Sequence, residues 1–195
     1  MFGYSFDTDA PKIFSTTAVY PQSAMKFMTG TPLGPSPLLF PYKGHGGKII
    51  MYDSLNDGIF SAVDLVNYYK SLNAVMAGQA PDFARLFLIP NMAHCGGGPA
   101  TNSFNANMLS AITNWVENEQ PPDRIIAANT NTTSPFPSGG IFDPRVARNF
   151  PTGGTRPLCP YPQQTRYKGT GATNDAANFA CVYPRRHDRA GGQAQ

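Results

Sequence analysis

Charged residues are scarce in this sequence, at 14% of its 195 residues, against about 25% in ordinary globular domains. The formal net charge is only +3, and the basic residues are spread along the chain except for Arg185, Arg186 and Arg189 near the carboxyl terminus. The sequence therefore has no basic stripe of the kind that binds nucleic acid. We interpret residues 185–195 as a solvated polar tail.

Long apolar runs are missing as well. None approaches the ~20 residues that cross a bilayer, so we expect a soluble chain with no membrane partner. The first residues, MFGYSFDTDAPKIF, lack the basic start and the apolar stretch of a signal peptide. We therefore expect the true amino terminus to lie upstream of Met1.

The chain has only three cysteines, which is an odd number. Cys159 and Cys181 can close one loop, which leaves Cys95 alone. Such a bridge would contribute about 3 kcal/mol through the loop entropy that it removes from the unfolded chain. A partner for Cys95 would have to come from outside these residues.

Glycine and proline, nineteen of each, are in clear excess over the usual combined share of about 12%. Residues 1–47 are expected to form turns and short segments, because TGTPLGPSPLLFPYKGHGG is too rich in both for a long element. Beyond about residue 128, NTNTTSPFPSGG and FPTGGTRPLCPYPQ predict loops that wrap the core. The 41% of hydrophobic residues still allow a sizeable core.

Regular structure is predicted between these loop-rich parts. KIIMY at 48–52 and ARLFLI at 84–89 predict two buried strands. Each strand is followed by an amphipathic helix. The first helix is predicted to be capped by Ser61, with Asp64 three residues on, and to stop near Gly78. The second is predicted to end at QPPD. The order strand, helix, strand, helix predicts parallel strands joined by a right-handed crossover, and so an α/β sheet.

Apolar residues at helical spacing predict the buried face of each helix. They are Leu65, Tyr68, Leu72 and Val75 in the first helix, and Phe104, Met108, Ile112, Trp115 and Val116 in the second.

Two polar residues follow the predicted strands, Asp57 after the first and His94 after the second, in IPNMAHCGGGP. Catalytic groups in α/β sheets collect beyond the carboxyl ends of the strands, and this order is the later part of the Ser, Asp, His order of α/β hydrolases. There the imidazole takes the proton of a serine hydroxyl and the carboxylate fixes the imidazole tautomer. The alternative is that both are structural, with His94 a core histidine in a tight turn.

Other acids and histidines compete for these roles. Asp53 lies nearer the strand end, but Asp57 stands further into the loop with Gly58 behind it, and we prefer Asp57. Asp64 is better explained as a helix-capping residue. His45, at the opposite end of the sheet, and His187, in the basic tail, are expected to be exposed.

A nucleophile is harder to identify. The sequence contains no G-x-S-x-G, and Ser36, Ser54 and Ser138 lack the strand-to-helix setting of a nucleophile elbow. Cys95 adjoins His94 in sequence, and such a neighbour rarely aligns with the imidazole nitrogen. GHGGKI does not complete a phosphate-binding loop, and His94 with Cys95 has no second pair of ligands for zinc.

Several separate stretches, in order, resemble the tannase and feruloyl esterase family. They are FDTDAPKIFSTTAVYPQSAMKFM, GGKIIMYDSLNDGIFS, APDFARLFLIPNMAHCGGGPATNSF, NWVENEQPPDRIIA and RPLCPYPQQTRYKGTGATNDAANFAC. The likeness runs from about residue 5 to 182 and implies a secreted or periplasmic α/β hydrolase that acts on esters of aromatic acids.

The resemblance also implies roles for individual residues. His94 matches the family's base, Asp57 its acid, and Cys95 one half of a disulfide whose other half precedes the catalytic serine. Cys159 and Cys181 match a cysteine pair near the family's end, which implies an oxidising compartment. Gly58, where the family often has Pro, and Asn91, where it has Gly, depart from the pattern without removing a catalytic atom.

The family's serine, oxyanion hole and calcium-bearing lid would all lie upstream of Met1. The resemblance therefore implies that residues 1–184 are the carboxyl-terminal part of such an enzyme, with no cofactor of their own. We expect a carboxylic ester hydrolase, feruloyl esterase-like by preference and inactive as an isolated chain. The alternative is a non-catalytic binding or accessory protein, completed by another chain that carries the missing amino-terminal half.

Overall fold

A computed structural model describes residues 3, 5–29, 36–90, 92, 94, 105–128 and 153–185. The chain divides into two compact units, Met1–Leu39 and Phe40–Gln195. None of the helices in these described segments combines the length and the apolar character that a membrane span needs.

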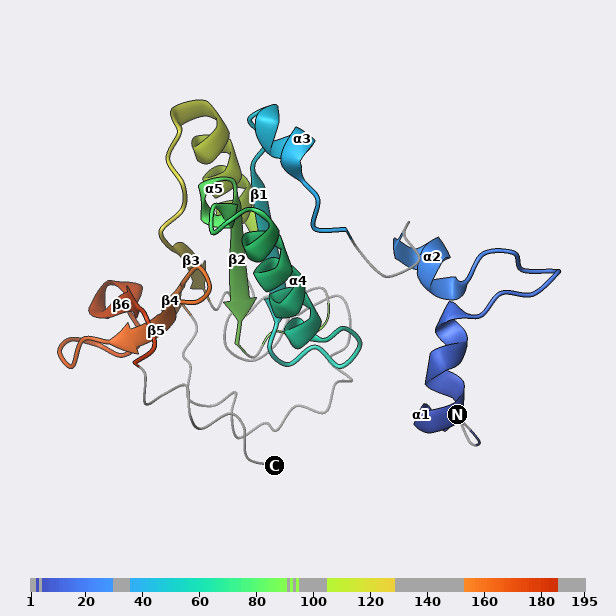
Figure 1. The fold of residues 1–195 in the computed structure, drawn as a ribbon. Coiled ribbons are helices and arrows are strands. Elements are labelled where there is room, and N and C mark those ends of the chain that lie inside the picture. Colours follow the sequence, from blue (N-terminus) through green and yellow to red (C-terminus); the bar gives the residue numbers. More distant parts are fainter. Residues whose placement is uncertain are drawn as a thin grey trace. The chain divides into compact units, whose positions relative to one another are not determined.

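The first unit consists of short elements, as its glycine and proline content predicts. They are α1 (Phe6–Asp9), the 3-10 helix η1 (Ala10–Phe14) and α2 (Ala24–Thr29) (Figure 1). Ser23 directly precedes α2, and its hydroxyl accepts a hydrogen bond from the Lys26 amide at 3.2 Å. Ser23 is also the one buried residue among those described in this unit. Eight large apolar side chains of its described residues are exposed, namely Phe6, Ile13, Phe14, Val19, Tyr20, Phe27, Met28 and Leu38.

The second unit is built on a parallel pair of strands. After α3 (Phe40–Gly44), β1 (Ile49–Ser54) pairs with β2 (Ala84–Ile89) in parallel, with Ile49 opposite Ala84 and Ser54 opposite Ile89. The helix α4 (Ala62–Val75) and the 3-10 helix η2 (Ala80–Asp82) connect the strands, and α5 (Asn105–Asn118) follows β2. The predicted order and the parallel pairing are confirmed, although β1 extends to residue 54 rather than 52.

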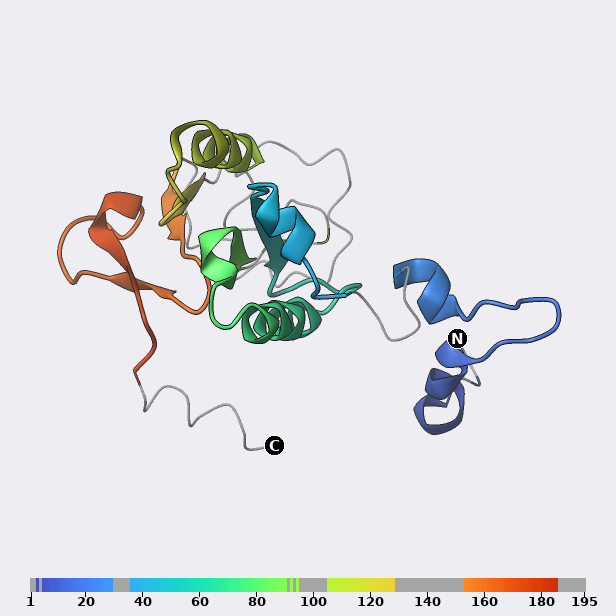
Figure 2. The ribbon, with the colours of Figure 1, turned by 45° about the horizontal axis from the view of Figure 1, so that its top comes forward.

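The two long helices lie on opposite sides of the strand pair (Figure 2). On one side, the Tyr69 hydroxyl of α4 donates to the Ala84 carbonyl oxygen at 3.2 Å. On the other, α5 covers the main hydrophobic cluster, which consists of Phe87, Ile89, Met92, Met108, Ile125, Ala127 and Leu158. Each face of the pair is therefore covered, as in an α/β layer arrangement.

The predicted helix faces need correction. In α4 the buried residues are Tyr69 and Leu72, while Val75 is 37% exposed. Tyr69 takes the inward position because its hydroxyl finds a carbonyl acceptor on β2. In α5, Met108 and Trp115 are buried as predicted, but Val116 is 59% exposed, and Phe104 lies outside the described residues.

The prediction that the Ser61 side chain caps α4 is also wrong. Ser61 occupies the N-cap position of α4 with extended backbone angles, but its side chain makes no capping hydrogen bond. The helix start instead uses backbone bonds, since the Asp64 amide donates to the Ser61 carbonyl oxygen at 2.9 Å.

Short antiparallel strands complete the unit, and three of them lie beyond residue 128, where the sequence predicts loops. β3 (Ile125–Ala128) pairs with β4 (Thr155–Leu158), and β5 (Gln164–Tyr167) pairs with β6 (Phe179–Val182), which follows the 3-10 helix η3 (Ala176–Asn178). After β4 the chain returns to β2, where the Tyr161 amide donates to the Leu86 carbonyl oxygen at 2.7 Å. This bond joins the carboxyl-terminal segment to the parallel pair.

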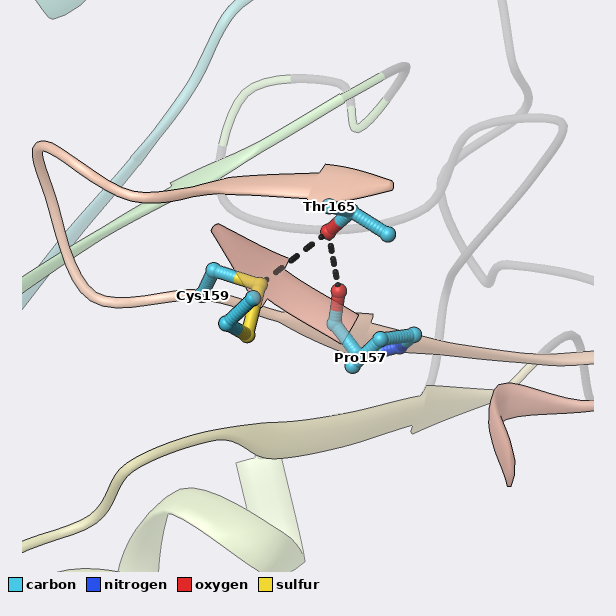
Figure 3. Close-up of a disulfide and its surroundings, with 4 residues drawn as sticks. Pro157, Cys159 and Thr165 are labelled. Atoms are coloured by element: carbon cyan, nitrogen blue, oxygen red, sulfur yellow. Dashed lines mark hydrogen bonds between the residues drawn. A yellow bond between two sulfur atoms is a disulfide. The ribbon is translucent and has the colours of Figure 1, made fainter. Parts of the chain in front are cut away.

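A disulfide between Cys159 and Cys181 links the residue after β4 to strand β6 (Figure 3). The Thr165 hydroxyl lies 3.3 Å from the Cys159 sulfur and donates to the Pro157 carbonyl oxygen at 2.7 Å. The disulfide and these contacts hold β4, β5 and β6 together. The pairing proposed from the sequence is therefore present.

Replacing Cys159 by Ser is expected to lower the free energy of unfolding by about 3 kcal/mol. The reason is that the cysteines are 22 residues apart, and opening this loop returns conformational freedom to the unfolded chain. Urea unfolding followed by circular dichroism measures the loss, which Cys181→Ser should reproduce. Equal urea midpoints for the variant and the unreduced natural chain would contradict the bridge.

Candidate active site

Asp57 and His94 meet beyond the carboxyl ends of β1 and β2. The Nδ1 atom of His94 lies 2.8 Å from the Oδ2 atom of Asp57. The two residues are 37 positions apart in sequence, and they come together because the parallel strands release the chain at the same edge of the sheet. The structure thus pairs the two residues that the sequence singled out.

The carboxylate of Asp57 is held on both oxygens. Its Oδ1 atom accepts hydrogen bonds from the Ile59 amide at 2.7 Å and the Phe60 amide at 3.0 Å, which leaves Oδ2 for His94. The Asp57 side chain is only 5% exposed. The acid is therefore fixed in its own loop independently of the imidazole.

The surroundings keep Asp57 ionised. Burial by itself raises the pKa of the Asp57 carboxyl, but the hydrogen bonds from His94, Ile59 and Phe60 outweigh it, and the pKa lies below its ordinary value of 3.8. Near neutral pH the group is a carboxylate. It can accept hydrogen bonds but cannot donate them.

This lowered pKa predicts an acid-sensitive contribution to stability. Because the folded pKa of Asp57 is below the unfolded one, its contribution is complete above pH 3.8 and disappears as the pH falls through the folded value. The unfolding free energy of the natural chain should therefore exceed that of Asp57→Asn by an amount that is constant near neutral pH and shrinks as the pH falls from about 5 to about 2. Urea unfolding across this range measures it, and a difference that grows toward low pH would contradict the lowered pKa.

His94 is oriented for proton transfer at its other nitrogen. Since the carboxylate only accepts, a neutral His94 carries its proton on Nδ1 and leaves Nε2 as an acceptor. Its side chain is 33% exposed, and the Phe60 ring lies beside it, with ring centroids 5.3 Å apart and planes at 47°. The imidazole is thus a partly open base with the Phe60 ring beside it.

The competing residues lie elsewhere. The Asp53 carboxylate accepts the amide of its neighbour Ser54 at 2.7 Å, and Asp64 is exposed in the first turn of α4. His45 is exposed before β1, as expected. Cys95, Ser138 and His187 fall outside the described residues, so the predictions made for them stay predictions.

Two neighbours of the pair are absent from the sequence prediction. Phe60 lies beside His94, and an aromatic residue three positions after the acid is a usable signal for it. Ser54, a candidate nucleophile in the sequence, is buried and its hydroxyl donates to the Met92 carbonyl oxygen. Within the described ranges, no group of three His, Cys, Asp or Glu side chains is placed to hold a metal ion.

Comparison with known proteins finds esterases among the relatives of this chain. A family model described as tannase and feruloyl esterase matches residues 6–182. The mono(2-hydroxyethyl) terephthalate hydrolase of Piscinibacter sakaiensis is 44% identical over 184 residues, which cover 94% of this chain and 27% of that protein. The probable feruloyl esterase B-1 of Aspergillus oryzae is 30% identical over 159 residues, which cover 74% of this chain and 26% of that protein.

Solved structures agree with the sequence relatives. The crystal structure of feruloyl esterase B from Aspergillus oryzae superposes with a TM-score of 0.62 at 26% identity, over 75% of this chain and 29% of that one. The chain thus spans less than a third of the length of each of these three relatives.

Proposed function

Because the chain belongs to the tannase and feruloyl esterase family, we propose that it carries the acid and the base of a serine-type carboxylic ester hydrolase. Asp57 is the acid and His94 the base, and the observation that carries this proposal is their hydrogen bond at the carboxyl edge of the parallel strands. The substrate is an ester of an aromatic acid. The names of the relatives, a mono(2-hydroxyethyl) terephthalate hydrolase and a probable feruloyl esterase, support this class.

The proposed reaction follows from the orientation of His94. Its Nε2 atom takes the proton of a serine hydroxyl as the serine oxygen attacks the ester carbonyl, and it then gives that proton to the departing alcohol. Water, activated in the same way, releases the aromatic acid and restores the serine. Asp57 remains ionised throughout and stabilises the imidazolium.

The serine and the oxyanion donors are proposed to come from a part of the enzyme outside residues 1–195. The sequence contains no G-x-S-x-G, and the matched relatives are more than three times as long as the matched segment. In this proposal β1 and β2 belong to a larger α/β-hydrolase sheet, in keeping with β2 being the one partner that β1 has among the described strands. Residues 1–195 alone are then inactive.

A second candidate is an accessory protein that is completed by another chain. The exposed apolar side chains of residues 1–39 favour it, because a unit whose described residues bury no apolar side chain gains stability only when something covers it. The covering surface is then the amino-terminal portion of a family member, supplied by another chain.

We also propose a secreted or periplasmic location. The Cys159–Cys181 disulfide supports it, since disulfides persist in oxidising compartments.

A completed enzyme tests the proposal. The part of the Piscinibacter sakaiensis hydrolase that precedes the matched region is fused to this chain, and hydrolysis of methyl ferulate, methyl gallate and mono(2-hydroxyethyl) terephthalate is measured. We expect turnover by the fusion and none by residues 1–195 alone. A folded fusion that hydrolyses none of the three esters would contradict the enzyme proposal and favour the accessory role. Turnover by residues 1–195 alone that requires His94 would place a nucleophile within them.

A further inference from the structure

Ser54 connects the loop that carries Asp57 to the segment that carries His94. Its hydroxyl donates to the Met92 carbonyl oxygen and accepts a hydrogen bond from the Asn56 amide at 2.9 Å. It is one of the two buried polar residues of the described chain, with 1% of its surface exposed. One hydroxyl therefore bonds to both segments that leave the strand ends.

This position rules out a direct chemical role for Ser54. A nucleophile must reach a substrate carbonyl, whereas this hydroxyl is buried and already donates its proton to Met92. We propose instead that Ser54 is a positioning residue that sets the distance between Asp57 and His94. The inference rests on the proposed function in one respect, because that function is what gives the Asp57–His94 pair a catalytic use.

The lengths of the connecting segments support a positioning role. Asp57 is three residues beyond Ser54, and His94 is two residues beyond Met92, so little chain separates the serine bond from the catalytic pair. Met92 is itself anchored, because its side chain is buried in the main hydrophobic cluster. On the other side, the Asp57 amide returns to the Ser54 carbonyl oxygen at 3.4 Å.

The backbone hydrogen bonds between β1 and β2 do not extend as far along the chain as Met92. The last bond between the two segments of the parallel pair runs from the Leu55 amide to the Ile89 carbonyl oxygen, at 3.1 Å. Beyond it, the hydrogen bond from the Ser54 hydroxyl extends the connection from residue 89 to residue 92. Removing the hydroxyl is therefore expected to loosen the His94 segment while leaving the paired strands intact.

Ser54→Ala tests this in the chain as it is. The probe is the low-field proton resonance of the His94 Nδ1–H group, observed with 15N-labelled histidine and identified by its absence in His94→Ala. We expect Ser54→Ala to lose this resonance, because a loosened Nδ1–H exchanges rapidly with water, and to retain the near-ultraviolet signal of buried Trp115. Ser61→Ala is the matched control, since the Ser61 side chain makes no capping bond, and it should keep both signals.

Each other outcome decides against the proposal. A folded Ser54→Ala chain that keeps the resonance would show that the pair does not depend on this hydroxyl. Loss of the Trp115 signal together with the resonance would show that Ser54 stabilises the whole unit rather than the pair. Ser54→Thr keeps a hydroxyl and should keep the resonance, so its absence from a folded Ser54→Thr chain would also overturn the positioning role.

The resonance is independent of ester hydrolysis. If the completed enzyme proves inactive while Ser54→Ala still abolishes the resonance, the proposed function fails and the positioning inference stands. If the enzyme is active and Ser54→Ala leaves both the resonance and kcat unchanged, the reverse holds.

Discussion

Replacing His94 by Ala is expected to lower kcat of the completed enzyme for methyl ferulate and mono(2-hydroxyethyl) terephthalate by about 10⁴ to 10⁶-fold. Without the imidazole, no other side chain that the structure describes at the carboxyl edge of β1 and β2 is placed to take the proton of the proposed serine, since the Asp57 carboxylate is buried and its Oδ1 atom is held by the Ile59 and Phe60 amides. Steady-state hydrolysis, followed by release of the aromatic acid, measures the loss.

The matched control for this loss is His45→Ala. His45 is exposed in the turn before β1, at the opposite end of the strand from Asp57, so its removal should leave kcat within about twofold of the parent, as for an ordinary surface substitution. If His94→Ala and His45→Ala had equal effects, His94 would not be the base.

Asp57→Asn is expected to lower kcat by about 10⁴-fold, although it preserves the size of the side chain. In the natural site, Oδ1 is held by the Ile59 and Phe60 amides. An asparagine should keep its carbonyl oxygen there, which turns its NH₂ group toward Nδ1 of His94. That donor stabilises the tautomer protonated on Nε2, and this tautomer cannot accept the serine proton.

The measurement is kcat of Asp57→Asn, together with the histidine resonances of the isolated chain. The Nδ1–H signal of His94 should disappear while the imidazole remains in place. Asp53→Asn is the control, because Asp53 bonds to the adjacent Ser54 amide rather than to His94. An Asp57→Asn enzyme with parental kcat would show that the acid has no role in orienting the base.

The parallel strand pair could be predicted because the patterns that indicate it lie within short stretches of the sequence. Short apolar runs at 48–52 and 84–89, each followed by residues at helical spacing, specify a strand, helix, strand, helix order without reference to distant parts of the chain. The strands β4, β5 and β6 were not predicted. TRPL and QTRY are short, contain polar residues or proline, and become strands only through partners such as Ile125 and Cys181.

The site was predictable to a similar extent. The position of Asp57 and His94 after successive parallel strands was enough to bring them together, because strand direction determines where both loops emerge. The choice of Asp57 over Asp53 depended on which carboxylate the loop turns toward the imidazole. The Ser54 bond could not be foreseen, because a serine at a strand end is equally compatible with a solvent contact until its burial is known.

The disulfide has a consequence for damage to the backbone. A single peptide-bond break anywhere between Cys159 and Cys181 leaves the polypeptide in one covalent piece, since the bridge joins the two sides of the break. The residues that return to the central strand, Pro160 and Tyr161, lie at the beginning of this closed loop. Nicking the β5–β6 hairpin would therefore become visible only under reducing conditions, while Cys159 and its neighbours remained tied to β6.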